Sequence, residues 1–207
     1  MTASGVEIEA KLLVPQRTAL EELRSCAQMA GFSVAPAVQS ILRDTYLDTR
    51  GRALLAAGYA CRRREQEGRI IMTLKSASTA GDVIHRRREL EVELPADRPP
   101  ALWPACEARD TLLPLIGSEP LMELLRIRQT RFLREARDGR RPVALVSLDE
   151  VVVEGAGGGE SWQEMEIELV PGGRERDIAA LAAWARARFG LAPSLLSKFE
   201  RALKLPR

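Results

Sequence analysis

The sequence predicts an α+β fold built on a mainly antiparallel β-sheet, with a few helices packed against it. About seven or eight segments alternate apolar and polar side chains with a period of two, as half-buried strands do. Most neighbouring segments are joined by connections of hairpin length, which favour antiparallel pairing. Only a few segments repeat apolar residues at helical spacing. The 207 residues contain neither a repeat nor a clear domain boundary, so we expect one domain, 1–207.

Composition narrows the classes of function. The net charge is only +2, from 31 basic and 29 acidic side chains, which argues against a protein that coats nucleic acid. Aromatic residues make up 4% of the chain, too few for a base-stacking platform. No apolar run reaches the length of a membrane span, and the N-terminus lacks a signal-peptide core. We therefore expect a cytoplasmic protein with no nucleic-acid and no membrane partner.

Cysteine and histidine usage narrows the chemistry. Cys26, Cys61 and Cys106 are widely spaced and form no metal motif, so they are expected to be free thiols in a reducing compartment. His85 is the single histidine. One histidine argues against a histidine-based zinc site or a Ser-His-Asp triad, and His85 itself is expected to be structural.

The first strand, 6–12, separates charged from apolar side chains. Successive side chains of a strand point to opposite faces, so Glu7, Glu9 and Lys11 share one face. The other face is apolar and suited to packing. The charged face has two interpretations, a solvated surface or a site for a metal and a phosphate group. Later strands decide between them.

The first half of the chain continues with a helix that starts at Pro15 and is closed by Gly31. A strand over 40–48 and a short helical turn over 52–57 come next. The strands 59–66 and 69–76 follow, joined by a turn at Gly68. A polar connection over 78–82 leads to a long strand over 83–94.

In the second half, 102–125 is expected to form helical pieces broken at Pro104, Pro114 and Pro120. Strands are expected over 127–136, 142–154 and 162–170, with a turn at Asp138-Gly139 and a flexible loop over 155–159. An amphipathic helix over 177–189 ends at Gly190, and a tail over 193–203 follows.

The charged strand faces are sorted by sign. One group of strands carries acids, and the strands between them carry bases. The acids are Glu7, Glu9, Glu164, Glu166 and Glu168, and the bases are Arg62, Arg64, Lys75, Arg87 and Arg131. Like charges side by side on a sheet repel each other, and a ligand relieves this repulsion. A divalent cation suits the carboxylates and a polyanion suits the arginines, so a cation bound to a polyphosphate suits both.

That combination is the equipment of phosphoryl transfer, which needs no side-chain nucleophile. No P-loop sequence is present. Each element also has a structural interpretation by itself. In that interpretation, the arginines form a basic surface patch and the glutamates an exposed strand face. Lys198 is then a helix-terminal lysine, Asp149 caps a turn, and Tyr46 and Asp48 brace a loop. The same arrangement on five strands favours a site.

The segment Glu7-Ile8-Glu9-Ala10-Lys11 resembles the Glu-x-Glu-x-Lys signature of the CYTH superfamily, the triphosphate tunnel metalloenzymes. The resemblance runs in order along nearly the whole chain. It continues through Tyr46-Leu47-Asp48-Thr49, Arg62-x-Arg64, Thr73-Leu74-Lys75, Arg87-x-Glu89-x-Glu91, Arg131, Asp149, Glu164-x-Glu166-x-Glu168 and Ser197-Lys198. It implies one CYTH domain, 1–207, in which an eight-stranded antiparallel β-barrel forms a tunnel and helices pack outside.

The resemblance also implies roles for individual residues. Mg²⁺ or Mn²⁺ is expected at Glu7, Glu9, Glu166 and Glu168, with Glu164 as a further candidate ligand. The triphosphate is expected at Lys11, Arg62, Arg64, Lys75, Arg87, Arg131 and Lys198. Catalysis is expected to depend on Glu7, Glu9, Lys11 and Lys75, with Glu89, Glu91, Asp149 and Glu164 in support. Arg63, Arg86 and Arg88 have the opposite parity and are expected outside the lumen.

Within the family, the length and the Ser-Leu-Leu-Ser-Lys tail resemble the CYTH domain of bacterial inorganic triphosphatases. Those proteins often carry a histidine-rich second domain, which a chain with one histidine is not expected to contain. The expected activity is metal-dependent hydrolysis of inorganic triphosphate. Alternatives are a nucleoside or thiamine triphosphatase, a class IV adenylate cyclase, and a non-catalytic polyphosphate or nucleotide-binding module. The metal-side glutamates favour catalysis, the low aromatic content disfavours an adenine or thiazolium pocket, and a homodimer stays open.

Overall fold

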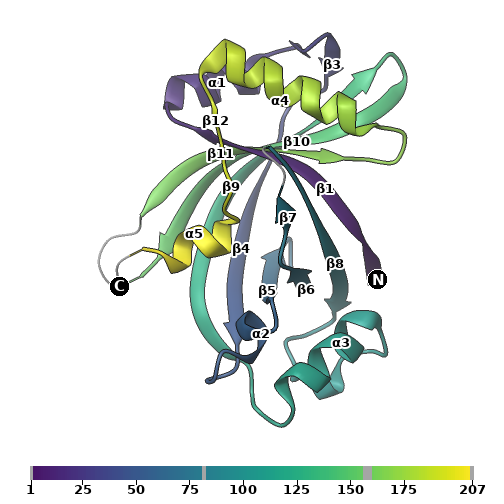
Figure 1. The fold of residues 1–207 in the computed structure, drawn as a ribbon, viewed down its shortest axis with the longest axis vertical. Helices are drawn as coiled ribbons and strands as arrows, with labels where there is room; N and C mark the ends of the chain where they lie inside the picture. Colours follow the sequence, from purple (N-terminus) through teal and green to yellow (C-terminus); the bar gives the residue numbers. More distant parts are fainter. Residues whose placement is uncertain (1, 81–82, 156–159, 206–207) are drawn as a thin grey trace.

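The computed structural model describes residues 2–80, 83–155 and 160–205. In these residues, eight long strands form a closed antiparallel barrel in the order β10-β11-β1-β8-β6-β5-β4-β9, and pairing of β9 with β10 closes it (Figure 1). The predicted eight-stranded barrel with helices outside is therefore confirmed. Its strands are β1 (Thr2–Val14), β4 (Val38–Asp48), β5 (Tyr59–Gln66), β6 (Arg69–Ser76), β8 (Ile84–Leu94), β9 (Met122–Asp138), β10 (Arg141–Glu154) and β11 (Ser161–Leu169).

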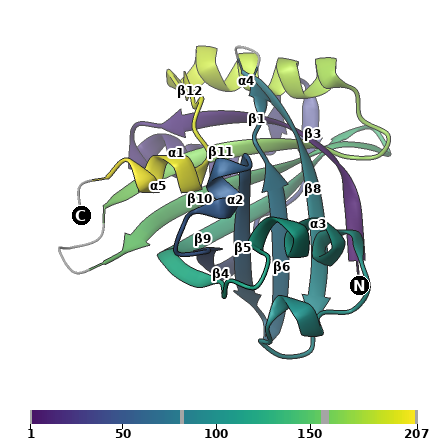
Figure 2. The same ribbon diagram turned by 60° about the horizontal axis from the view of Figure 1, so that its bottom comes forward.

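Short strands and helices complete the fold. Figures 1 and 2 show α1 and α4 together at one end of the molecule and α3 at the other. The helices are α1 (Arg17–Ser25), α2 (Ala53–Ala56), α3 (Glu107–Ile116), α4 (Glu175–Phe189), α5 (Lys198–Leu203) and a 3₁₀ turn over Pro100–Leu102. The short strands are β2 (Gln28–Met29), β3 (Phe32–Val34), β7 (Thr79–Ala80) and β12 (Ala192–Pro193).

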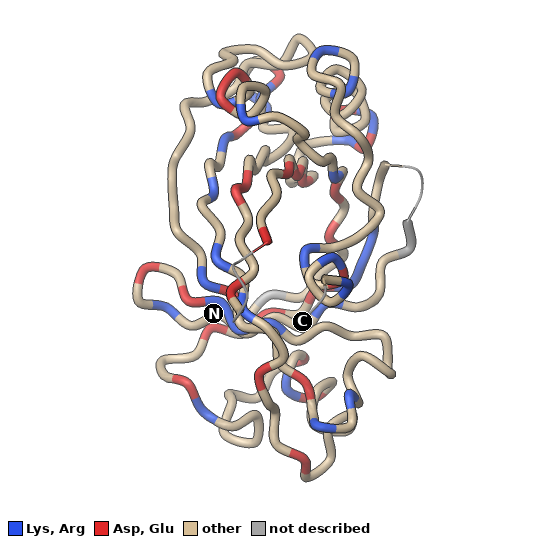
Figure 3. Tube along the Cα trace, turned by 90° about the vertical axis from the view of Figure 1, so that its left-hand side faces the viewer, with Lys and Arg blue, Asp and Glu red and all other residues tan. Residues whose placement is uncertain are grey.

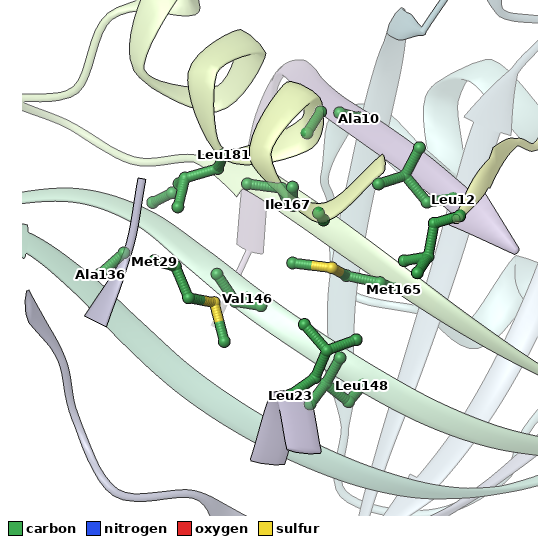
Figure 4. Packing of buried hydrophobic residues seen from close by; sticks show 14 of the residues in the cluster. Ala10, Leu12, Leu23, Met29, Ala136, Val146, Leu148, Met165, Ile167 and Leu181 are labelled. Atoms are coloured by element: carbon green, nitrogen blue, oxygen red, sulfur yellow. The ribbon is translucent and has the colours of Figure 1, made fainter. Parts of the chain in front are cut away.

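On β1, β5, β6, β8, β10 and β11, apolar side chains point outward and pack against helices. One cluster packs α1 and α4 against β1, β10 and β11, with Leu12, Leu148 and Ile167 fully buried beneath Leu23 and Leu181 (Figure 4). A second cluster packs α3 against β5, β6 and β8. Because apolar side chains point outward on these strands, the alternate charged side chains point into the barrel.

A third apolar cluster lies inside the barrel. Phe199 and Ala202 of α5 pack against Tyr46, Ile127 and Val151 of the barrel strands. The rings of Tyr46 and Phe199 stack with centroids 4.6 Å apart and an interplanar angle of 16°. The interior therefore has an apolar part beneath α5 beside its charged part, which the alternation of the strands does not predict.

The predicted helix over 15–31 was wrong in its second half. Helix α1 ends at Ser25, and Ala30 and Gly31 form the turn between β2 and β3 with φ of 52° and 85°. The cause is tertiary. The guanidinium of Arg134 donates to the carbonyl oxygens of Leu23 at 2.6 Å and Cys26 at 2.7 Å, which satisfies the helix end.

The predicted helical pieces over 102–125 were also wrong in part. Pro114 lies inside α3, near its C-terminal end, so its missing N–H costs the helix one hydrogen bond but does not break it into separate pieces. Residues from Met122 onward belong to β9, which pairs with β4 as far as Asp48. In the predicted connection over 78–82, Thr79–Ala80 form β7, and 81–82 lie outside the described residues. Most of the predicted loop over 155–159 also lies outside them.

Candidate active site

A cavity of about 440 Å³ lies inside the barrel and is lined mainly by charged side chains. Figure 3 shows basic and acidic positions along the strands that surround it. Every residue predicted to bind the metal or the triphosphate lines this cavity, except Glu164, the further candidate ligand. The predicted residues that line it are Glu7, Glu9, Lys11, Arg62, Arg64, Lys75, Arg87, Glu89, Glu91, Arg131, Glu166, Glu168 and Lys198. Asp149 and Glu164 are buried and contact Lys198.

The two ends of the chain supply the acidic wall. Strand β1 pairs with β11, so that Glu9 lies opposite Glu168 and Lys11 opposite Glu166. Glu7 contacts Lys75 Nζ at 3.1 Å and Arg87 Nε at 2.5 Å. Burial raises the pKa of Glu7, but Lys75 and Arg87 together outweigh it and hold that pKa well below its usual range.

Glu9 shares Arg87 with Glu7 and also contacts Lys11. One of its carboxylate oxygens lies 3.0 Å from Lys11 Nζ and 2.8 Å from Arg87 Nη2. Glu9 is 2% exposed, so this charge is neutralised inside the protein rather than by water. Cations on β1, β6 and β8 thus contact Glu7 and Glu9.

Glu168 differs from the other acids of this wall. Within the described part of the chain it forms neither a hydrogen bond nor an ion pair, and it is exposed. Partial desolvation of the carboxyl group by the surrounding barrel, together with Glu7, Glu89 and Glu9 nearby, raises its pKa to about 7 against the opposing effect of Lys75. A cation placed among these acids would hold Glu168 ionised.

The basic wall is organised by acids that are buried behind it. Arg64 makes two hydrogen bonds of 2.7 Å to Asp44, and Arg62 lies 3.9 Å from the same carboxylate. Arg62 also donates to Thr73 Oγ1 at 3.0 Å. Arg131 binds both oxygens of Asp149, at 2.8 and 2.7 Å.

Asp44 is a site residue that the sequence analysis missed. It is 1% exposed and accepts a further hydrogen bond of 2.6 Å from Gln129 Nε2. Burial raises its pKa, but Arg62 and Arg64 lower it below the usual value. Its parity with Tyr46 places Asp44 on the inner face of the strand, but one acid on that face does not by itself indicate a site.

Lys198 is surrounded by carboxylates. Its ammonium lies 3.0 Å from Asp149 and 2.8 Å from Glu166, and it also contacts Glu164. Oxygens of these three acids lie within 4.8 Å of one another. Burial lowers the pKa of Lys198, but the three acids outweigh it and raise that pKa above its usual value.

Other charged residues singled out in the sequence lie elsewhere. Arg63 pairs with Asp97, Arg86 with Glu175 and Arg88 with Glu107, all on the outside, as their parity predicts. The Asp48 carboxylate accepts from the backbone N–H groups of Thr49, Leu54 and Leu55, so it braces the loop into α2. His85 is buried beside Ser78, 3.4 Å from its Oγ, and does not line the cavity.

The donor set of the acidic wall fits a hard divalent cation. Mg²⁺ and Mn²⁺ prefer carboxylate oxygens, and Glu7, Glu9, Glu166 and Glu168 offer them on adjacent strands. Glu168 supports the fit, because within the described ranges it is the one member of this set that forms no ion pair with a basic group.

None of the described helices has the length and apolar character needed to cross a membrane.

Comparison with known proteins agrees with this geometry. Residues 5–202 match the protein family described as CYTH domain. A Hippeastrum protein, provisionally assigned as an adenylyl cyclase and described as having a dominant triphosphatase activity, has a similar structure. It aligns with a TM-score of 0.73 and 21% identity over 97% of both chains. No curated protein matches the chain.

Two bacterial and archaeal structures are also similar. A provisional adenylate cyclase of Bacillus halodurans aligns with a TM-score of 0.67 and 21% identity, over 96% of this chain and 97% of the other. A protein of Pyrococcus horikoshii aligns with a TM-score of 0.57 and 21% identity, over 95% and 98%. At these identities the similarity concerns the fold.

Proposed function

The chain belongs to the CYTH domain family, and from that premise we propose that it is a metal-dependent triphosphatase that hydrolyses inorganic triphosphate. Residues 1–207 would form one domain for this purpose. The observation that carries the proposal is the cavity inside the barrel, which is lined by acids of β1 and β11 together with arginines and lysines of β5, β6, β8, β9 and α5. A polyphosphate with a bound cation matches both walls at once.

The basic side chains would hold the phosphate oxygens. Arg62, Arg64, Arg87 and Arg131 present guanidinium groups, which match phosphate geometry, and Lys11, Lys75 and Lys198 add point charges. Each of them contacts a carboxylate in the structure, so a triphosphate would replace or share these partners. The contacts keep the cations in place before the substrate binds, which reduces the reorganisation needed on binding.

The acidic side chains Glu7, Glu9, Glu166 and Glu168 would hold the metal. When bound, Mg²⁺ or Mn²⁺ neutralises charge on the phosphate oxygens and orients the leaving group. Lys11 and Lys75 contact Glu9 and Glu7, respectively, and therefore lie where the two walls meet. Glu7, Glu9, Lys11 and Lys75 are accordingly the proposed catalytic residues, and water is the nucleophile.

Glu89, Glu91 and Asp149 would keep the basic groups in register. Lys75 lies 2.9 Å from Glu89, and Arg62 lies 3.7 Å from Glu91. The Hippeastrum protein, whose triphosphatase activity is described as dominant, supports hydrolysis over cyclisation through a shared fold.

An organic triphosphate is a second candidate substrate. The cavity also has apolar lining, which includes Tyr46, Leu55, Tyr59 and Phe199. Both tyrosines of the chain line it, so a low aromatic content overall does not mean an absence of aromatic rings at the site. A nucleoside or thiamine group attached to the triphosphate would have an apolar surface to contact.

A phosphate-release panel tests the proposal. Tripolyphosphate, ATP and thiamine triphosphate are incubated with the protein and Mg²⁺ or Mn²⁺, and cyclic AMP is measured in parallel. We expect phosphate release from tripolyphosphate and no cyclic AMP. Tight triphosphate binding with no turnover of any compound would contradict the enzyme and indicate a non-catalytic binding module.

A further inference from the structure

Glu164 and Asp149 belong to the charged interior but do not line the cavity. They are 2% and 0% exposed. Asp149 holds Arg131 through both oxygens and lies 3.0 Å from Lys198 Nζ. Glu164 contacts the same ammonium with one oxygen, while its other oxygen accepts a hydrogen bond of 2.7 Å from Trp162 Nε1.

Three acids in this region have the spacing of a cation site, namely Asp149, Glu164 and Glu166. Cationic side chains of the protein already contact all three. The ammonium of Lys198 contacts all three, and Arg131 binds Asp149 and Glu166. Among the described residues, Lys198 is the one charged group that contacts Glu164. Glu164 is therefore placed to act on Lys198.

Trp162 fixes Glu164 from the opposite side. It precedes Glu164 by two residues on β11, so both side chains share the inner face of the strand. The guanidinium carbon of Arg201 on α5 lies 5.7 Å from the centroid of the indole ring, and the guanidinium donates to Ser194 Oγ at 3.2 Å. Residues of α5 thus contact Trp162 and Glu164, and Lys198 begins the same helix.

We propose that Trp162 and Glu164 are positioning residues for Lys198, in a chain that runs from the indole N–H through the carboxylate to the ammonium at the cavity wall. That Lys198 in turn binds a triphosphate rests on the proposed function. A lysine side chain is long and flexible, so contacts that hold its ammonium in place reduce the ordering cost of binding. Because Trp162 and Glu164 lie outside the cavity lining, they act through Lys198.

Competitive acetylation of the 207-residue chain tests the positioning directly. Acetic anhydride labels the four lysines Lys11, Lys75, Lys198 and Lys204, and peptide mass spectrometry compares their rates. In Trp162→Phe, which keeps an aromatic ring and removes the donor, we expect the Lys198 rate to rise at least about tenfold, as loss of one hydrogen bond to a charged group predicts. In Glu164→Gln the rise should be at least as large. The rates at Lys11 and Lys75 should stay at the wild-type values.

Matched controls separate positioning from general loosening. Trp184→Phe removes an indole N–H from α4, where Trp184 packs against Phe189, and Glu150→Gln removes a carboxylate from β10. Neither should change labelling of Lys198. An unchanged Lys198 rate in Trp162→Phe would overturn the proposal, and so would an equal rise at Lys11 and Lys75.

Kinetics then show whether positioning matters for the substrate. With tripolyphosphate, Trp162→Phe should raise KM about fivefold and change kcat less than about twofold, since uniform binding is lost. A protein that hydrolyses no triphosphate but shows the labelling pattern would contradict the proposed function and leave the positioning intact. If Trp162→Phe shows wild-type labelling of Lys198 and wild-type hydrolysis of tripolyphosphate, the positioning is contradicted and the proposed function is kept.

Discussion

Glu9 and Glu168 lie directly opposite each other on the paired strands β1 and β11, although they come from opposite ends of the sequence. Glu9 is buried and bound to Lys11 and Arg87, whereas Glu168 is exposed and forms no ion pair among the described residues. The pair therefore combines a carboxylate that is already fixed with one that is open to a ligand. This difference makes the acidic wall testable one residue at a time.

Glu9→Gln should abolish turnover and leave the fold intact. The change removes one proposed metal ligand and preserves side-chain volume, so kcat for tripolyphosphate should fall at least about 100-fold. Phosphate release and the thermal unfolding midpoint are measured together. Glu119→Gln, on an exposed loop before β9, is the matched control. An unaffected rate in Glu9→Gln would show that this face of β1 is not catalytic.

Metal affinity should depend on pH through Glu168. Without metal the pKa of Glu168 is raised to about 7, so its carboxyl group is protonated below that pH. A metal binds the ionised carboxylate, so protons and metal compete for this group. The apparent affinity for Mn²⁺ should therefore weaken by up to about tenfold for each pH unit below 7 and level off above it. Calorimetric titration between pH 5.5 and 8 measures this. Glu168→Gln should lose both affinity and pH dependence, and a wild-type affinity that is flat with pH would contradict the assignment.

Asp44→Asn should destabilise the protein, and triphosphate should restore part of the loss. The change leaves Arg62 and Arg64 close together without their buried partner, which typically lowers the free energy of unfolding by about 3–5 kcal/mol. Tripolyphosphate supplies replacement charge and should raise the unfolding midpoint of the variant more than that of the wild type. Asp97→Asn breaks the exposed pair with Arg63 and should have an effect below about 1 kcal/mol.

The same residue predicts a sign for acid stability. The pKa of Asp44 is lower in the folded protein than its usual value, so its stabilising contribution is present above the unfolded pKa and is lost as pH falls through the folded pKa. Between neutral pH and strong acid, Asp44→Asn should therefore lose less stability than the wild type. Urea denaturation at several pH values measures the difference, and parallel losses would show that Asp44 contributes nothing to it.

Phe199→Ala should lower the free energy of unfolding by about 3–5 kcal/mol, because it removes a buried ring that stacks on Tyr46 inside the barrel. Leu195→Ala, at a side chain that is 62% exposed, should stay within about 0.5 kcal/mol. Chemical denaturation of both variants measures this. Equal effects would mean that α5 is not packed in the barrel interior in solution.

The antiparallel sheet and most of its charged face could be predicted because the strand period determines which side chains share a face. The closure of that sheet into an eight-stranded barrel was implied by the resemblance to the CYTH superfamily. Glu7, Glu9 and Lys11, for example, follow from alternation on one strand. Asp44 could not be recognised in this way, because a single acid gives no pattern until Arg62 and Arg64 are brought to it. The end of α1 depends on Arg134, which is distant in sequence, and local spacing carries no signal for such a contact.

The position of α5 shows the same limit. Its sequence predicts a tail with a lysine, and nothing in that tail indicates that Phe199 enters the barrel or that Lys198 reaches three carboxylates from other strands. Trp162 was likewise not a candidate, because its role depends on the hydrogen bond to Glu164 rather than on any spacing.

Phosphate release from tripolyphosphate, measured with Mg²⁺ or Mn²⁺ and again with excess EDTA, tests the central claim most directly. We expect release of the terminal phosphate with either metal and none with EDTA, together with loss of activity in Glu9→Gln. Hydrolysis that persists in EDTA, or a wild-type protein that binds tripolyphosphate and never cleaves it, would contradict a metal-dependent triphosphatase.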